Sequence, residues 1–166
     1  METSGVPPSR STVSRTAVLV LRILTFVFLL IALILIAINK DSDLGVKFSD
    51  VYSYRYMIST IVIGFAYNLL QMAFSFFGLV SGNRVITGNG GYLFDFYGDK
   101  VISYLLATGC GAGFGASKDL HNATDGYDLS NFFAKSYASA SLLLFGFLFT
   151  AVASIFSSYA LPKKAY

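Results

Sequence analysis

The stretch GDKVISYLLATGCGAGFGASKD, residues 98–119, decides how this chain is expected to fold. A helix of about 20 residues covers the ~30 Å hydrocarbon core of a bilayer, and this stretch predicts a span over about residues 98–117. It carries an acid, Asp99, near its start. A run of small residues follows: Gly109, Gly111, Gly113 and Gly115. Because a charge in lipid needs a partner and glycine offers lipid little side-chain surface, the helix is predicted to be an interior element around which others pack.

The composition indicates a membrane protein. Hydrophobic residues make up 55% of the chain and charged residues 13%, against about 25% charged residues in soluble globular domains. The apolar residues come in long blocks, which predict further spans over about residues 17–38, 57–80 and 132–159. The expected fold is an all-α membrane protein, a four-transmembrane-helix bundle over residues 17–160 with short loops.

Both ends of the chain are expected outside the bilayer. Residues 1–16 are rich in Ser, Thr and Pro and are expected to form a disordered tail, and residues 161–166 form a second short tail. A secretory signal peptide is the rival interpretation of the first apolar run, but its apolar region would be only about 7–15 residues long and would end at a small-residue cleavage site. The longer run, ending in Ile36-Ala37-Ile38-Asn39, favours an uncleaved anchor.

Four spans place both termini on one side of the membrane. The segments expected on that side carry five cations: Arg10, Arg15, Arg84, Lys163 and Lys164. Those on the opposite side carry four: Lys40, Lys47, Arg55 and Lys118. The positive-inside rule therefore favours cytosolic N- and C-termini.

Arg22 in the first span and Asp99 in the third are predicted to lie at similar depth. An unpaired charge deep in the bilayer costs roughly 2.5–3.5 kcal/mol on insertion scales, and a bidentate Arg–carboxylate pair removes most of that cost. We expect a structural intramembrane pair that fixes helix register. Two alternatives stay open: both side chains extend to the headgroups, or they belong to a proton or ion relay.

The glycines form two overlapping small-xxx-small spacings, Gly109 with Gly113 and Gly111 with Gly115. This spacing lets another helix approach closely. A matching small face in the fourth span consists of Ser136, Ser139 and Ala140. Packing within the chain and self-association both remain open on this pattern.

Three further polar positions are singled out by the sequence. Asn68 and Gln71 lie one helical turn apart in the second span, so their amides share a face and can bond a neighbouring helix. Asn122 begins the sequon Asn122-Ala123-Thr124 in the predicted third loop, which is a candidate for N-glycosylation.

Several function classes find no support in the sequence. With one cysteine, Cys110, and one histidine, His121, an intramolecular disulfide and a Cys/His metal site both lack their residues. The net charge of +3 is scattered, which gives no footprint for nucleic acid. We expect no catalytic residues, no enzyme activity and no cofactor; membrane lipid is the expected surrounding partner.

Several stretches resemble the plant Casparian strip membrane domain protein family and its broader CASP-like group. The resemblance rests on these segments: Tyr54-Arg55-Tyr56-Met57, Ala66-Tyr67-Asn68-Leu69-Leu70-Gln71, Phe94-Asp95-Phe96-Tyr97-Gly98-Asp99-Lys100 and Tyr104-Leu105-Leu106. Arg22 and Asp99 correspond to the family's arginine and aspartate in spans one and three. The family is also similar to the MARVEL four-helix membrane domain.

The resemblance implies a plasma-membrane protein that forms homodimers, higher homo-oligomers or hetero-oligomers with related proteins. The Casparian members form a membrane scaffold that positions cell-wall-modifying enzymes. The first outer loop, NKDSDLGVKFSDVYSYRY, lacks the apolar motif of those members, so the chain is identified as a CASP-like member.

Three functions follow as hypotheses. The first is a non-enzymatic, self-associating scaffold or membrane-domain organiser linked to cell-wall modification. The second is a small oligomeric channel or transporter in which Asn68, Gln71 and Asp99 line a polar path. The third is a MARVEL-like trafficking protein.

Overall fold

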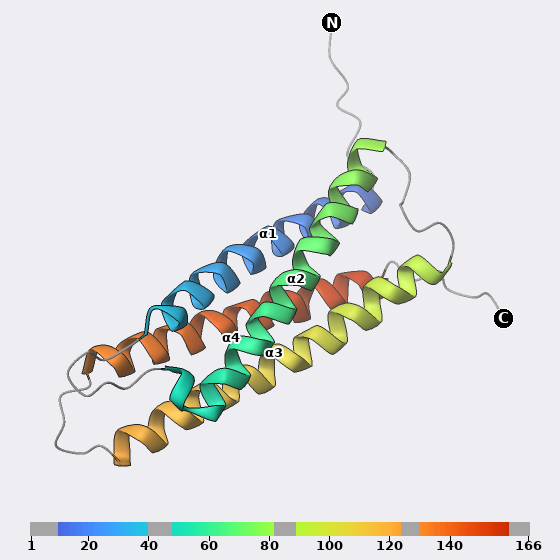
Figure 1. The fold of residues 1–166 in the computed structure, drawn as a ribbon. Coiled ribbons are helices and arrows are strands. Elements are labelled where there is room, and N and C mark those ends of the chain that lie inside the picture. The colour runs from blue at the N-terminus through green and yellow to red at the C-terminus, as the bar shows by residue number, and fades with distance from the viewer. Residues whose placement is uncertain (1–9, 40–47, 82–88, 124–129, 160–166) are drawn as a thin grey trace, which may run out of the picture.

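The computed structural model describes residues 10–39, 48–81, 89–123 and 130–159, and within these ranges the chain is helical, without strands. The elements are α1 (Arg10–Ala37), the short 3-10 helix η1 (Phe48–Asp50), α2 (Tyr52–Ser81), α3 (Asn89–Ala123) and α4 (Ser130–Tyr159). The four α-helices run lengthwise beside one another and alternate in direction (Figure 1). The all-α fold predicted from the sequence is confirmed.

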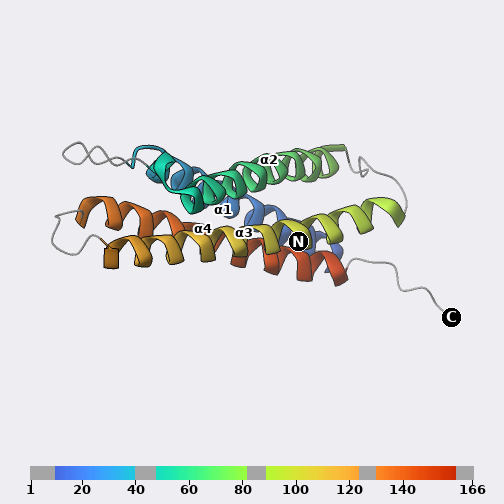
Figure 2. The same cartoon turned by 60° about the horizontal axis from the view of Figure 1, so that its bottom comes forward.

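The helices form a closed ring in the order in which they follow along the chain. The helix α4 packs extensively on both α1 and α3, while α2 packs on the other side against the same two helices. The diagonal pairs, α1 with α3 and α2 with α4, have far less backbone contact. Figure 2 shows the resulting elongated bundle along its side. Any interaction between α1 and α3 must therefore be made by side chains that cross the interior.

Three of the described helices contain stretches long and apolar enough to cross a membrane: Thr16–Ala37, Tyr52–Gly78 and Ser130–Ser158. The helix α3 is less apolar, because its first half carries Asp95, Asp99 and Lys100 and its second half is rich in glycine. It nevertheless runs the length of the bundle between α2 and α4 (Figure 1). The four helices therefore cross the membrane together, as the predicted four-helix membrane bundle requires.

The helices are longer than the predicted spans. Residues 10–16, expected in the disordered tail, form the first turns of α1, while residues 1–9 and the predicted tail 161–166 lie outside the described residues. The helix α3 exceeds the predicted span 98–117 at both ends, and α2 begins at Tyr52 instead of residue 57. Hydropathy locates the part of a helix that matches the hydrocarbon core, whereas the helix itself continues into the polar interface.

The middle of the bundle is a mainly apolar core between two polar layers. Fully buried apolar side chains come from all four helices: Leu29, Ala32, Met57, Ile61, Leu106 and Leu143. We call the end of the bundle that holds Arg22 and Asp99 the Asp99 end, and the opposite end, near Asn39 and Phe132, the Asn39 end. Both ends contain buried polar side chains, and the functional-site candidates lie there.

Candidate functional site

The Asp99 end is organised around an ion pair between diagonal helices. Arg22 of α1 donates from Nη1 to Oδ1 of Asp99 in α3 and from Nη2 to Oδ2, each over 3.1 Å. The side chains of Arg22 and Asp99 are 4% and 0% exposed. Two parallel bonds between a guanidinium and a carboxylate give both energy and a fixed orientation. This is the geometry of a buried pair, not of two side chains that extend to the headgroups.

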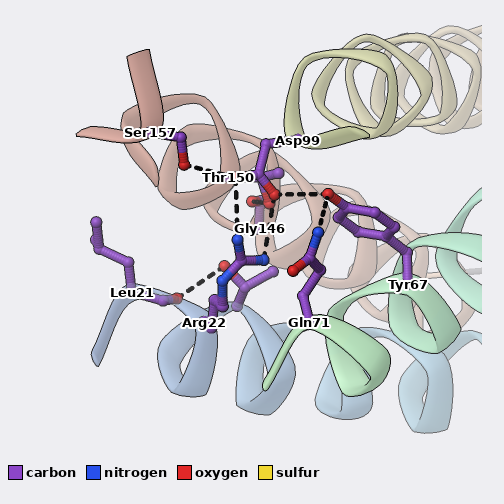
Figure 3. A network of polar contacts seen from close by, with 9 residues as sticks. Leu21, Arg22, Tyr67, Gln71, Asp99, Gly146, Thr150 and Ser157 are labelled. Atoms are coloured by element: carbon purple, nitrogen blue, oxygen red, sulfur yellow. Dashed lines mark hydrogen bonds and ion pairs between the residues drawn. The ribbon is translucent and has the colours of Figure 1, made fainter. Parts of the chain in front are cut away.

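Two further donors bind the same carboxylate. The hydroxyl of Tyr67 in α2 donates to Oδ1 over 2.9 Å, and the hydroxyl of Ser157 in α4 donates to Oδ2 over 3.2 Å. Gln71 in turn donates from Nε2 to the Tyr67 oxygen over 2.8 Å, which leaves the tyrosine proton free for Asp99. Figure 3 shows these residues converging on Asp99 from the other three helices. Each oxygen of the carboxylate thus accepts two hydrogen bonds.

Asn68 attaches the backbone of α1 to the same cluster. Its Nδ2 donates to the main-chain oxygen of Arg22 over 2.8 Å, and its side chain is buried. The structure therefore brings the predicted amides Asn68 and Gln71 together with the predicted pair Arg22–Asp99. We call these residues, together with Tyr67 and Ser157, the Asp99 cluster.

Gly98 makes room for the tyrosine of the cluster. A Cβ added at Gly98 would lie 2.5 Å from the Tyr67 hydroxyl oxygen and 2.9 Å from the Cε2 atom of its ring. A residue with a side chain at this position would push the ring away from α3. The glycine before Asp99 is therefore part of what allows the hydroxyl to reach the carboxylate.

The Asp99 cluster contains one positive and one negative side chain, and their charges cancel. One cation and one anion are buried together, so no net charge is carried into the membrane. The carboxylate accepts four hydrogen bonds, two from the Arg22 guanidinium and two from hydroxyl groups, as a buried charge requires. Among the described residues, Nε of Arg22 is the one buried nitrogen of the cluster with no hydrogen-bond partner.

A second polar layer closes the Asn39 end. Asn39 donates from Nδ2 to the main-chain oxygen of Phe132 over 3.1 Å and to the Ser136 hydroxyl over 2.7 Å. The Tyr54 hydroxyl lies 2.9 Å from that of Ser117. Because Ser117 donates its own proton to the Gly113 carbonyl, Tyr54 is the donor in that pair. This layer ties α1 to α4 and α2 to α3.

The two predicted glycine pairs lie on opposite sides of α3. A Cβ at Gly109 would collide with the side chain of Thr60, and one at Gly113 would collide with Met57 and lie 3.2 Å from the Cβ of Ala140. At Gly111 and Gly115 an added Cβ would meet nothing within 4 Å. One pair therefore serves packing within the chain, while the other faces outward.

The small residues predicted in the fourth span also make contacts inside the bundle. The Ser139 hydroxyl donates to the carbonyl of Ala32 in α1 over 2.8 Å, and the Ala140 carbonyl accepts a bond from the Cys110 sulfur at 3.5 Å. Ser136 belongs to the Asn39 layer. These residues therefore face two helices, α1 and α3.

The remaining candidates lie apart from both layers. Asn122 is exposed in the last turns of α3, and Thr124 of its sequon lies outside the described residues. The ring of His121 packs against the ring of Phe133, with 5.0 Å between the two ring centroids. The described residues contain no group of three or more His, Cys, Asp or Glu side chains that could hold a metal ion.

Sequence reasoning missed Tyr67 and Ser157. Tyr67 precedes Gln71 by one helical turn, so its position on the same face was available as a signal. No comparable signal points to Ser157, because the last turns of α4 contain several serines. Asn39 and Tyr54 were likewise not predicted as bonded core residues.

The fold and the Asp99 cluster together define a class: a multi-pass four-helix membrane protein with a buried ion pair between its first and third helices. Sequence comparison assigns the family. The model of the Casparian strip membrane protein domain matches residues 11–158, and the chain belongs to this family.

Curated relatives match the chain over nearly its whole length. CASP-like protein 4D1 of Glycine max is 64% identical, covering 99% of this chain and 98% of the relative. CASP-like protein 4D1 of Ricinus communis is 52% identical over 95% and 98% of the two chains. CASP-like protein 4D2 of Arabidopsis thaliana is 47% identical over 95% and 97%. No solved structure matches the chain.

Proposed function

We propose that this chain is a non-enzymatic plasma-membrane protein that associates with copies of itself and with related proteins to form a membrane scaffold. The observation that carries the proposal is that the Asp99 carboxylate accepts four hydrogen bonds, all from groups of the Asp99 cluster. The side chains of the cluster bond to one another and to the backbone of α1, and these bonds join the four helices. With its polar interior used for internal bonds, the bundle offers its lateral faces as its main interaction surface.

Membership in the Casparian strip membrane protein family supports the scaffold role. It also supports the link to enzymes that modify the cell wall, which a scaffold would hold in one membrane region. The distribution of cations along the sequence supports cytosolic termini. Access of a protease to a tag at either terminus, in sealed plasma-membrane vesicles of known orientation, tests that placement.

Photobleaching of the fluorescently tagged protein in a plant plasma membrane tests the scaffold role directly. A scaffold gives discrete patches with little recovery of fluorescence over minutes. Rapid and complete recovery in a uniform membrane would reject the proposal, and a signal mainly on vesicles would favour a trafficking role. Co-precipitation of two differently tagged copies tests self-association separately.

The channel hypothesis has less support from the geometry. Asn68, Gln71 and Asp99 would have to exchange their bonds with one another for bonds to a passing solute. Flux of labelled ions and small solutes into proteoliposomes decides the matter. Reproducible transport above that of protein-free liposomes would replace the scaffold proposal with a channel or transporter.

A further inference from the structure

One face of α3 is exposed along most of the membrane and follows a regular spacing. Its residues are Tyr97, Val101, Tyr104, Thr108, Gly111 and Gly115, all classed as exposed. Successive members are alternately four and three residues apart. We call this set the α3 stripe. An alternating spacing of four and three is the heptad pattern by which one helix packs along another with a slight left-handed crossing.

The chemistry of the α3 stripe differs from that of the outward faces of α1 and of the second half of α4. The exposed residues of α1 between Val20 and Ile34 are large and aliphatic, and those of α4 between Leu144 and Ile155 are large and apolar. Such residues suit contact with lipid chains. The α3 stripe instead presents two tyrosines, two glycines and Thr108, whose hydroxyl is bonded to the Tyr56 hydroxyl of α2. The glycines give lipid little apolar surface.

The bundle itself does not require the glycines of the α3 stripe. An added Cβ at Gly111 or Gly115 would meet nothing within 4 Å, whereas the space beside Gly109 and Gly113 is occupied by side chains of the same chain. Glycine inside a helix costs about 1 kcal/mol relative to alanine. A close neighbour outside the chain would make use of both the open surface and the exposed backbone.

We propose that the α3 stripe is the surface on which a second copy of this chain docks, α3 against α3. The inference rests on the self-association in the proposed function and adds the face that makes the contact. Copies inserted in the same direction are related by a two-fold axis along the membrane normal, so each residue of α3 meets its own equivalent at the same depth. The glycines then face glycines, and the two helices approach most closely at Gly111 and Gly115.

Charge at the end of the stripe favours a second copy over an unrelated partner. Lys118 continues the spacing three residues beyond Gly115, and Asp119 follows it; both are exposed. In a two-fold contact the two copies of Lys118 meet at the same depth, and the exposed Asp119 carboxylate beside each of them offsets the repulsion between the two lysines. This end of the stripe carries one base and one acid, so a contact with a second copy brings no net charge together there.

Disulfide cross-linking in native membranes tests the α3 stripe. The one cysteine, Cys110, is buried, and Cys110→Ala provides a cysteine-free background. Single cysteines are introduced in the stripe as Thr108→Cys, Gly111→Cys and Gly115→Cys. Matched exposed positions on the other helices are Ile31→Cys, Leu69→Cys and Leu148→Cys. After mild oxidation, we expect a covalent dimer at the α3 positions and none above background at the other three.

The outcomes separate this inference from the proposed function. Co-precipitation of two tagged copies with cross-linking strongest on α1, α2 or α4 overturns the α3 stripe but leaves self-association standing. Absence of both co-precipitation and cross-linking overturns the two together. A cross-linked band of another mass shows that a different protein covers the stripe, and overturns docking of a second copy.

A bulky pair of substitutions provides an independent test. The double variant Gly111→Leu, Gly115→Leu fills open space and replaces glycine by a better helix former, so its thermal midpoint as a detergent-held monomer is expected to be at least that of the wild type. Its co-precipitation is expected to be lost. The control, Ala66→Leu with Ala73→Leu, adds bulk to exposed positions of α2 and should associate normally. A folded glycine variant that still associates, or equal loss in the control, overturns the inference.

Discussion

Arg22 and Asp99 belong to helices that lie diagonally across the bundle, yet two hydrogen bonds of 3.1 Å join them. Each helix packs closely against the two helices beside it in the ring, whereas α1 and α3 have little backbone contact. The pair Arg22–Asp99 joins α1 to α3 across the interior, and the other residues of the Asp99 cluster surround it. Loss of the pair should therefore loosen the relation between all four helices.

Substitution of the acid tests that relation. Asp99→Asn leaves the Arg22 guanidinium buried without its counter-charge, and removal of one partner from a buried pair costs about 3–5 kcal/mol. We expect reduced surface expression and a lower thermal midpoint in detergent. Adding Arg22→Gln to Asp99→Asn should restore part of both, because no uncompensated charge remains. Wild-type expression and stability of the single variant would contradict the buried pair.

Tyr67→Phe isolates the contribution of one hydroxyl. The change removes a donor to Asp99 and leaves the Gln71 amide without its acceptor, so we expect a loss of about 1–3 kcal/mol in the free energy of unfolding. Tyr52→Phe is the matched control, since the Tyr52 side chain is 83% exposed. Equal stability of the two variants in detergent unfolding would show that the Tyr67 hydroxyl contributes nothing.

Gly109→Ala and Gly111→Ala form a matched pair two residues apart. At Gly109 an added Cβ would collide with Thr60 and lie 2.9 Å from its Cβ, so rotation of the Thr60 side chain cannot relieve the contact. We expect a loss of about 1–3 kcal/mol from overpacking. Gly111→Ala meets open space and should gain up to about 1 kcal/mol from helix propensity. Thermal unfolding of the detergent-held monomer measures the stability of both variants. A Gly109→Ala variant more stable than Gly111→Ala would show that α3 is rotated differently.

Asn39→Asp tests the second polar layer. The new carboxylate would face the carbonyl oxygen of Phe132, which now accepts a bond from the amide. A buried charge without a counter-charge should lower the stability by about 3–5 kcal/mol. Asn122→Asp, at an exposed position near the end of α3, should leave the thermal midpoint unchanged. Similar midpoints for both variants would show that Asn39 is in contact with water.

The fold was largely predictable because each membrane span is a continuous apolar run. The pair Arg22–Asp99 was predictable from depth, since both residues stand near the start of spans that begin on the same side. The rotation of α3 was not predictable. Gly109 with Gly113 and Gly111 with Gly115 have identical spacing, but an offset of two residues turns a helix by about 200°. Only the positions of Thr60, Met57 and Ala140 decide which pair faces inward.

The two polar layers also fix how thick a membrane the bundle prefers. Arg22 in α1 and Asn39, two residues beyond the end of α1, are separated by about 25 Å at ~1.5 Å per residue, and each is bonded to other helices. The helices therefore cannot slide past one another to suit a thinner or thicker bilayer. A bundle with a fixed apolar height adapts instead by tilting or by deforming the lipid around it, at a cost that grows with the mismatch. Copies gathered in one patch would impose a common lipid thickness there, and membranes of that thickness would retain the protein.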